Sequence, residues 1–368
     1  MRELCKRAAR RSWPALLLLA TGIGLIASAI AAPDDVARMR QMIETKVSSG
    51  EFMGAVLVAQ HGRILLSQGY GFANLEWRVP NTPRTRFRIA SVSKQFTAAA
   101  ILLLEERGKL KTSDPVGKYL ADAPPAWSKI TLFHLLTHTS GLANFTDFPD
   151  YARTETMPAR PQELVDKFRD KPLEFEPGAR WKYSNSGYVL LGCVIEKLSG
   201  GSYADFIREN IFAPLGMHHS GYDSNGAIIP QRASGYSPGA AGPVNAGYID
   251  MRVPFAAGGL YSTTEDLLRW EQALFGGRIL SRTSLEKMTT PFKNGYAFGL
   301  VVAQETGHKT IEHGGGIEGF NSALVYYPQN DVVVVVLANL NGHSGDLAKG
   351  LGAIAQGWPV PQAPTASR

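Results

Sequence analysis

The sequence predicts a mixed α/β (α+β) fold, in which helices flank a sheet and an all-helical domain is inserted into the sheet domain. Strand-like apolar runs occur near the N-terminus and return in the last third of the chain. Residues 116–253, between them, contain helical periods and Pro/Gly loops with few alternating strands. The predicted sheet domain is therefore discontinuous, with residues 32–115 and 254–357, and residues 116–253 form the insertion.

Short apolar runs predict the elements of the sheet domain. A helix is expected over residues 32–48, because its apolar residues lie on one side. Five consecutive valines, residues 332–336, indicate a strand that is buried on both faces. Residues 347–354 are expected to form a closing helix, and residues 358–368 a mobile tail. The strands are expected at residues 54–60, 63–71, 298–304, 310–313, 320–327 and 332–340.

The first 31 residues have the pattern of a signal peptide. A basic start is followed by an apolar run to Ile30, and Ala29-Ile30-Ala31 fits a small-x-small cleavage site. We therefore expect an exported protein, periplasmic or extracellular. Because the apolar run is slightly long, an uncleaved anchor is the alternative. Cleavage removes five basic residues and one acidic residue, so the net charge falls from +6 to +2 and gives no reason to expect a nucleic-acid partner.

The cysteine and histidine pattern gives no reason to expect a metal or another cofactor. Cys5 lies in the signal segment, so the mature chain retains Cys193 alone and can form no internal disulfide. Cys193 lies in an apolar, helix-like run and is expected to act as a small packed hydrophobe. No Cys/His cluster has the spacing of a metal site.

Ser91 and Lys94 are three residues apart, at the start of a helical run that reaches Glu106. If Ser91 opens this helix, both side chains rise from one face, a turn apart. A partly desolvated lysine can take a proton from the serine, and the helix N-terminus stabilises the charge that develops there. This arrangement suits an acyl-transferring serine. The alternative is a simple helix cap, as we expect at the second Ser-x-x-Lys match, Ser284 with Lys287.

Tyr183-Ser184-Asn185 is the only Tyr-x-Asn in the chain. A phenol beside a lysine ammonium can be held as phenolate, or share its proton, and serve as a general base. Asn185 can hold a substrate amide through its donor and acceptor together. The alternative is a loop tyrosine followed by a capping asparagine.

His313-Gly314-Gly315-Gly316 follows a strand-like run. Glycines at a strand edge let a substrate backbone approach, and a bare N–H there can serve an oxyanion hole. The alternative is a turn-forming glycine cluster. Two further histidines, His134 and His138, lie in a predicted short helix and its capped end, where we expect structural hydrogen bonding.

These three motifs, in this order, resemble the serine β-lactamase and penicillin-binding DD-peptidase superfamily, on its class C-like side. Residues 135–142 and 258–263 also look like landmarks of that family, and the resemblance covers roughly residues 35–355. It implies a mixed, mainly antiparallel sheet domain built from both chain ends, an all-helical insertion, and an active site between them.

The resemblance also implies a role for each motif residue. Ser91 would be the acyl-accepting nucleophile, with Lys94 and Tyr183 sharing the base and proton-shuttle roles. Substrate binding would fall to Asn185, on the acyl side, and to His313 and Gly315. The N–H groups of Ser91 and Gly316 would form the oxyanion hole.

One departure from the family pattern bears on the substrate. His313 stands where relatives keep a lysine that supplies positive charge for a substrate carboxylate. A histidine is mostly neutral near pH 7, and we expect His313 to gain that charge below about pH 6.5. The chain is therefore expected to hydrolyse an amide or ester of a small-molecule or peptide substrate, most favourably D-amino-acid peptides or β-lactam-related compounds. The alternatives are a carboxylesterase and a catalytically silent cell-wall or ligand-binding protein.

Overall fold

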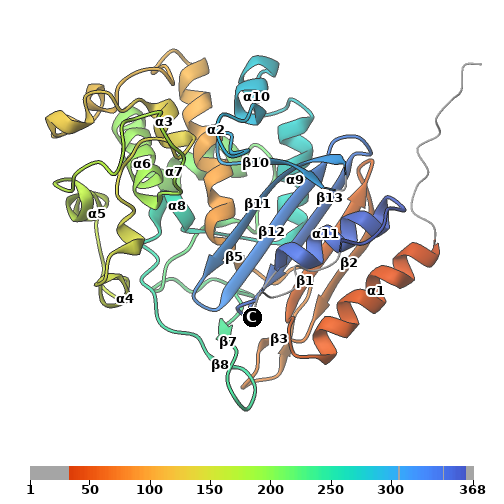
Figure 1. The fold of residues 1–368 in the computed structure, drawn as a ribbon. Helices are drawn as coiled ribbons and strands as arrows, with labels where there is room; N and C mark the ends of the chain where they lie inside the picture. The colour runs from red at the N-terminus through yellow and green to blue at the C-terminus, as the bar shows by residue number, and fades with distance from the viewer. Residues whose placement is uncertain (1–32, 306, 343, 362–368) are drawn as a thin grey trace, which may run out of the picture.

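The computed structural model describes residues 33–305, 307–342 and 344–361 (Figure 1). The predicted signal peptide lies outside these residues. None of the helices within them is long and apolar enough to cross a membrane.

A six-stranded antiparallel sheet forms the centre of the sheet domain, in the order β10-β11-β12-β13-β1-β2. Strand β1 pairs with β13 along its whole length, from Gly54 opposite Ala338 to Gln60 opposite Val332. One sheet therefore contains strands from both ends of the chain, as predicted. The strands are β1 (Gly54–Gln60), β2 (Arg63–Tyr70), β10 (Val301–Glu305), β11 (His308–Ile317), β12 (Phe320–Tyr327) and β13 (Val332–Ala338).

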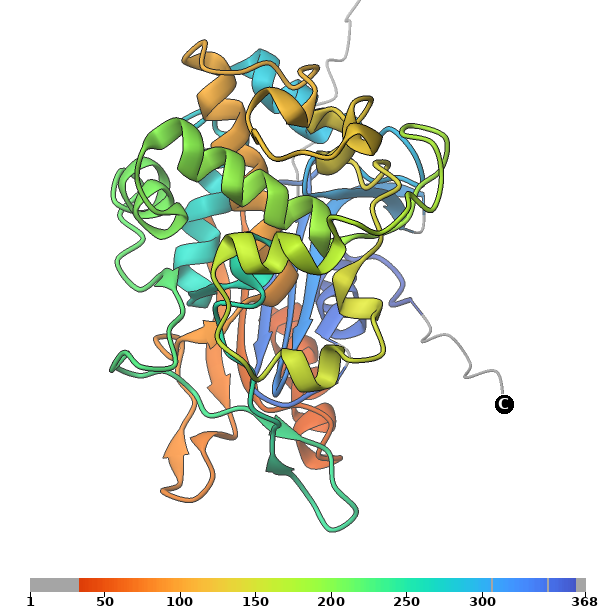
Figure 2. The same ribbon diagram turned by 90° about the vertical axis from the view of Figure 1, so that its left-hand side faces the viewer.

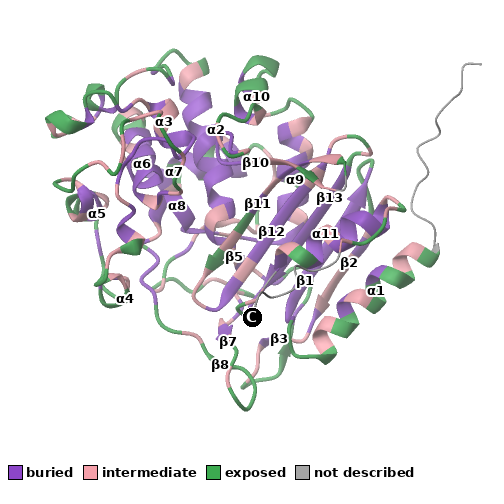
Figure 3. Cartoon of the chain, in the orientation of Figure 1, coloured by how far each residue is buried: buried purple, intermediate pink, exposed green. Residues whose placement is uncertain are grey.

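Helices cover both faces of this sheet. On one face lie α1 (Pro33–Ser48) and α11 (Ser344–Ala355), and on the other lie α2 (Ser93–Glu106) and α9 (Thr264–Phe275) (Figures 1 and 3). The valines of β13 alternate between two apolar clusters, since successive side chains point to opposite faces. Every residue of β13 is buried, which confirms the expected two-sided burial.

The predicted insertion is mainly helical and packs beside the sheet domain (Figure 2). Its α-helices are α3 (Leu132–Leu136), α4 (Tyr151–Thr154), α5 (Pro161–Phe168), α6 (Asn185–Ser199) and α7 (Tyr203–Ile207). Short strands β6 (Gly221–Tyr222), β7 (Tyr236–Ser237) and β8 (Val244–Asn245) follow them. The remaining elements are β3 (Phe72–Asn74), β4 (Val79–Pro80), β5 (Phe87–Arg88), α8 (Phe255–Gly258), β9 (Leu260–Ser262) and α10 (Arg282–Thr289).

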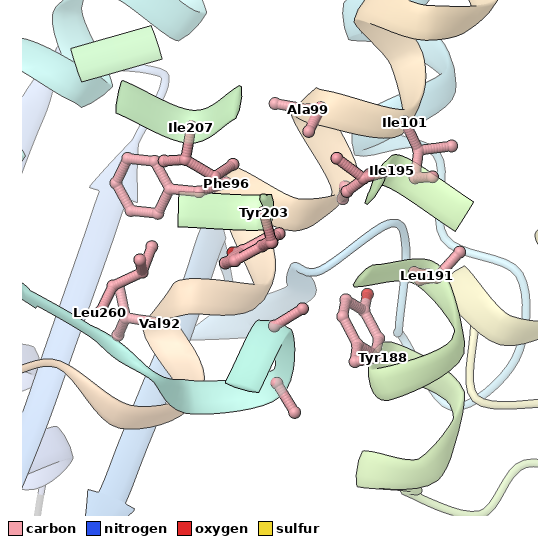
Figure 4. Close-up of a cluster of buried hydrophobic side chains, with 14 of the residues drawn as sticks. Val92, Phe96, Ala99, Ile101, Tyr188, Leu191, Ile195, Tyr203, Ile207 and Leu260 are labelled. Carbon is pink, nitrogen blue, oxygen red and sulfur yellow. The ribbon is translucent and has the colours of Figure 1, made fainter. Parts of the chain in front are cut away.

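Helix α2 is buried on all sides from Ser93 to Leu104, which makes it the central element of the molecule. Its apolar side chains pack against α6 and α7 in one buried cluster, which includes Phe96 and Ile101 of α2 with Ile195 of α6 and Ile207 of α7 (Figure 4). The N-terminus of this helix is therefore held rigidly, since a close-packed interior resists displacement.

Cys193 lies in α6, packs against the main apolar cluster and is a free thiol. Burial raises the pKa of this thiol to about 12, which suits the expected packing role and not that of a nucleophile.

Near the C-terminus, Trp358, the first residue of the predicted tail, stacks on the His308 ring, with 3.5 Å between the ring centroids.

Strand β11 is longer than predicted. The predicted strand ends at His313, but Gly314, Gly315 and Gly316 continue it opposite Ala323, Ser322 and Asn321 of β12, so the alternative of a turn-forming glycine cluster does not hold. Pairing with a neighbouring strand holds these glycines extended despite their low intrinsic strand preference.

Candidate active site

Ser91 lies in a single 3-10 turn, Ala90–Val92, immediately before α2. The preceding residue, Ala90, has a φ of 45°, a left-handed conformation that is uncommon for a residue with a side chain. Such local strain often occurs at functional sites, where the surrounding structure must hold it. Ser91 thus stands at a sharp connection between β5 and α2.

Gly315 lets β11 approach this connection. A Cβ atom at Gly315 would lie 2.5 Å from the Ile89 carbonyl oxygen and 2.9 Å from the Ser91 nitrogen, distances that no side chain tolerates. Ser322 Oγ also donates to the Ile89 carbonyl oxygen at 2.8 Å. Gly315 was predicted to contact substrate, and the structure shows a second reason for a glycine here, since a side chain would collide with the backbone that carries Ser91.

Lys94 is fully buried, one turn along from Ser91. Its Nζ lies 3.2 Å from Ser91 Oγ, 2.8 Å from Asn185 Oδ1 and 2.7 Å from the Ala257 carbonyl oxygen. Burial lowers the pKa of this amine well below its ordinary value. A neutral amine can donate to Asn185 and Ala257 and accept the Ser91 proton, whereas the ammonium can donate to all three. The three partners of Lys94 Nζ can therefore bond to it both before and after it accepts a proton.

Tyr183 approaches the same oxygen from the insertion. Its hydroxyl donates to Ser91 Oγ at 2.8 Å, and its ring centroid lies 4.7 Å from Lys94 Nζ. Burial raises the pKa of this phenol above its ordinary value. We expected a possible phenolate, but the direction of this shift keeps the phenol protonated near neutral pH, so Lys94 is the better candidate for the base.

Asn185 is the first residue of α6 and lies beside Lys94. Its Oδ1 accepts from Lys94, and its Nδ2 donates to Thr146 Oγ1 at 3.1 Å. Because the carbonyl oxygen is engaged and the amide has a second N–H, this second N–H is the group left for a substrate carbonyl. Asn185 was expected to bind a substrate amide through both its carbonyl oxygen and its N–H, but only one N–H is left for the substrate.

The two histidines of the insertion make the predicted structural hydrogen bonds. His134 Nδ1 accepts from the Thr131 N–H at 3.2 Å in a capping box, and His138 Nδ1 accepts from the Ser184 N–H at 3.1 Å. The second bond fixes the backbone of Ser184, the residue that follows Tyr183. Sequence reasoning gave no indication of this link to the site.

The second Ser-x-x-Lys match has no such surroundings. Ser284 lies inside α10, whose N-cap is Ser281, so Ser284 is not the cap that we expected. Lys287 makes a surface ion pair with Glu105 at 2.9 Å. The same Ser-x-x-Lys pattern therefore has a different environment at each place. Lys94 is buried beside Tyr183, whereas Lys287 lies at the surface.

The structure corrects the prediction for His313. Its side chain is 5% exposed and does not line the cavity beside Ser91. Nδ1 donates to the Gly314 carbonyl oxygen at 2.6 Å, and Nε2 accepts from the Tyr296 hydroxyl at 2.9 Å. Burial, followed by the charge of Lys94, lowers the pKa of His313 to about 4. It therefore does not gain positive charge below pH 6.5 as expected, and the lysine of the resemblance has no charged replacement here.

This shift predicts a pH dependence of stability. Because the folded-state pKa lies below the ordinary 6.5, the unfolded chain binds a proton at His313 between about pH 4 and 6.5 that the folded chain does not. This one site should lower the free energy of unfolding by about 1.4 kcal/mol for each pH unit of acidification in that window. Urea unfolding of the wild type and His313→Asn at several pH values measures the difference in slope. Equal slopes would show that His313 titrates alike in both states.

A cavity of about 210 Å³ opens beside Ser91. Residues of the predicted sheet domain and of the predicted insertion line it. Gly316, the predicted second oxyanion donor, lines it with Ser91 and Asn185, so these three predicted residues lie together. Sequence reasoning missed Tyr151 and Glu318, which also line it. Glu318 follows the glycine run by two residues, a signal that could have been noticed.

Asn144 was missed as well. Its Oδ1 accepts from the Asn185 N–H at 2.9 Å, so it caps the start of α6 from another part of the chain. Ser186 Oγ, in turn, donates to the Ala143 carbonyl oxygen at 2.7 Å. These bonds hold residues 143–146 against Asn185 and define one wall of the site.

The geometry can now be set beside known proteins. The family model described as Beta-lactamase matches residues 39–357, which include every residue of the site described above. The chain belongs to the Beta-lactamase family. One curated relative, "Penicillin-binding protein 4*" of Bacillus subtilis (strain 168), is 34% identical to this chain over 324 residues. The match covers 82% of this chain and 71% of the relative.

Two solved structures have the same fold as this chain. A penicillin-binding protein from Bacillus halodurans matches with a TM-score of 0.76 and 31% identity, over 86% of this chain and 98% of that one. A D-amino acid amidase from Ochrobactrum anthropi SV3, solved with D-phenylalanine, matches with a TM-score of 0.76 and 26% identity, over 88% and 97% of the two chains. The fold and the family agree with the expectation from the motifs.

Proposed function

We propose that this chain is an exported serine hydrolase that forms an acyl-enzyme at Ser91, with D-amino-acid amides and peptides as its main substrate class. The observation that supports this most strongly is the convergence of Lys94 Nζ and the Tyr183 hydroxyl on Ser91 Oγ, at 3.2 and 2.8 Å. A serine hydroxyl is a weak nucleophile unless a neighbouring base removes its proton. The family membership and the similarity to a D-amino acid amidase support the substrate class.

In the proposed reaction, neutral Lys94 accepts the Ser91 proton while Oγ forms a bond to the substrate carbonyl carbon. The N–H groups of Ser91 and Gly316 stabilise the oxyanion that forms. Tyr183 gives its phenol proton to the leaving nitrogen or oxygen as the bond to it breaks, and the Lys94 ammonium restores that proton. Water then attacks the acyl-enzyme with the same groups in reversed roles, which releases the acid and free Ser91.

A substrate panel tests this proposal. Wild-type protein is assayed with D-phenylalanine amide, a D-alanyl-D-alanine peptide, nitrocefin and p-nitrophenyl esters, and is labelled with a fluorophosphonate. We expect labelling at Ser91 and the highest kcat/KM with the D-amino-acid amide or peptide. Turnover of esters alone would favour a carboxylesterase, and a folded protein with neither labelling nor turnover would favour a binding protein.

Tyr183→Phe tests the proton-donor role of the phenol. The ring and its packing remain and only the hydroxyl is lost, so substrate binding should change little. We expect kcat for amides to fall by about 10²- to 10⁴-fold, the usual contribution of general acid–base catalysis. Esters with good leaving groups should be less affected, because their leaving oxygen needs less protonation. Stopped-flow acylation measures both, and an unchanged amide rate would assign leaving-group protonation to Lys94.

A further inference from the structure

One carboxyl group lies in the wall of the cavity beside Ser91. Glu318 lines the cavity, and its lining among the described residues contains no lysine, arginine or histidine. The His313 side chain is buried against Tyr296, does not line this cavity and stays neutral above about pH 4. A substrate that enters the cavity therefore meets a carboxylate on the wall and no lining cation.

A second carboxyl group supports Glu318 from behind. Oε2 of Glu318 is buried and has no hydrogen bond from any ordinary N–H or O–H donor. The carboxyl group of Glu155, just after α4, contacts it, and burial followed by the charge of Glu318 raises the pKa of Glu155 to about 7. A proton on Glu155 gives Oε2 the donor that it otherwise lacks. Glu318 is therefore held from one side by Glu155, while the residue lines the cavity on the other.

The position of Glu318 limits where a bound cation can be. It is the turn residue that follows β11, two residues after Gly316, whose N–H is the proposed oxyanion donor, and it lines the same cavity as Ser91. A cation held by Glu318 therefore lies inside the cavity that would receive the acyl group. The α-ammonium or the side-chain ammonium of an aminoacyl group meets this condition.

We propose that Glu318 selects amide and peptide substrates whose acyl group carries a primary ammonium, held by its carboxylate beside Ser91. This inference rests on the proposed function, since it names the substrate class of the same site. A hydrogen bond between oppositely charged groups in a partly buried site is strong enough to change affinity about 10- to 100-fold. Substrates that carry a carboxylate instead meet like charge without a compensating cation.

Four matched ligands test the selectivity at pH 7, where an α-amino group is mainly protonated. D-phenylalanine amide carries an α-ammonium, Nα-acetyl-D-lysine amide carries only a side-chain ammonium, N-acetyl-D-phenylalanine amide is neutral, and N-succinyl-D-phenylalanine amide is anionic. Hydrolysis is measured with wild type, Glu318→Gln and Glu155→Gln. Calorimetric binding is measured in a Ser91→Ala background with the same two glutamate variants, so that selectivity is read without turnover.

We expect at least one ammonium ligand to exceed the neutral ligand about tenfold or more in binding and in kcat/KM, and the better one identifies the source of the ammonium. Glu318→Gln should remove this preference, mainly through KM, with a smaller effect on the neutral substrate than on the ammonium substrates. Glu155→Gln should retain it, because the glutamine amide can donate to Glu318 in place of the carboxyl proton. Equal binding of ammonium and neutral ligands, or equal loss for both in Glu318→Gln, overturns the inference. Absent turnover with preserved ammonium selectivity in the binding assay contradicts the proposed hydrolase and leaves the role of Glu318 supported.

Discussion

Ser91→Ala is expected to reduce turnover by about 10⁴- to 10⁶-fold, because it removes the hydroxyl oxygen on which Lys94 and Tyr183 converge. The substitution removes one partly exposed oxygen, and Lys94 retains its bonds to Asn185 and Ala257. The folded structure and ligand binding should therefore persist. Steady-state kinetics, the melting temperature and calorimetric binding measure the three properties.

Ser284→Ala is the matched control for this prediction. Ser284 belongs to the other Ser-x-x-Lys pattern and lies inside α10, away from Tyr183 and the cavity. Its replacement should leave kcat and KM at their wild-type values. A Ser91→Ala protein that keeps more than a small fraction of turnover, after removal of contaminating hydrolases, would refute the assignment of the nucleophile.

Lys94→Met should cause a loss of about 10³-fold or more in the acylation rate. Methionine is similar in length and packs well, but its thioether cannot take the Ser91 proton. Tyr183 cannot replace the amine at neutral pH, since burial raises the pKa of its phenol and keeps it protonated. Single-turnover acylation by an activated ester measures the step directly. An acylation rate within tenfold of wild type would transfer the role of base to Tyr183.

The matching control is Lys287→Met. Lys287 is exposed and makes a surface ion pair with Glu105, a type of contact that contributes little to stability. We expect wild-type kinetics and a small change in melting temperature. The contrast between the two lysines tests whether burial, and not the Ser-x-x-Lys spacing, makes Lys94 reactive.

The fold could be predicted to a large extent because its elements leave local patterns. Strands β1 and β12 begin and end at the predicted residues, Gly54–Gln60 and Phe320–Tyr327. The valine run indicated two-sided burial, since only a strand between two layers tolerates such a sequence. The end of β11 was predicted wrongly, because glycines usually favour turns and the pairing with β12 that overrides this preference is not local.

The reactive side chains, and the family to which their order belongs, could be recognised without the structure, because the serine, lysine, tyrosine and asparagine occur in short motifs of recognisable spacing. What those side chains can do depends on how the chain folds around them. The tertiary structure buries His313 against Tyr296, where burial keeps it neutral, and it keeps the Tyr183 phenol protonated. It also brings Glu318 of the sheet domain against Glu155 of the insertion. Charge state depends on desolvation and on neighbours far away in the chain, and no local spacing encodes either.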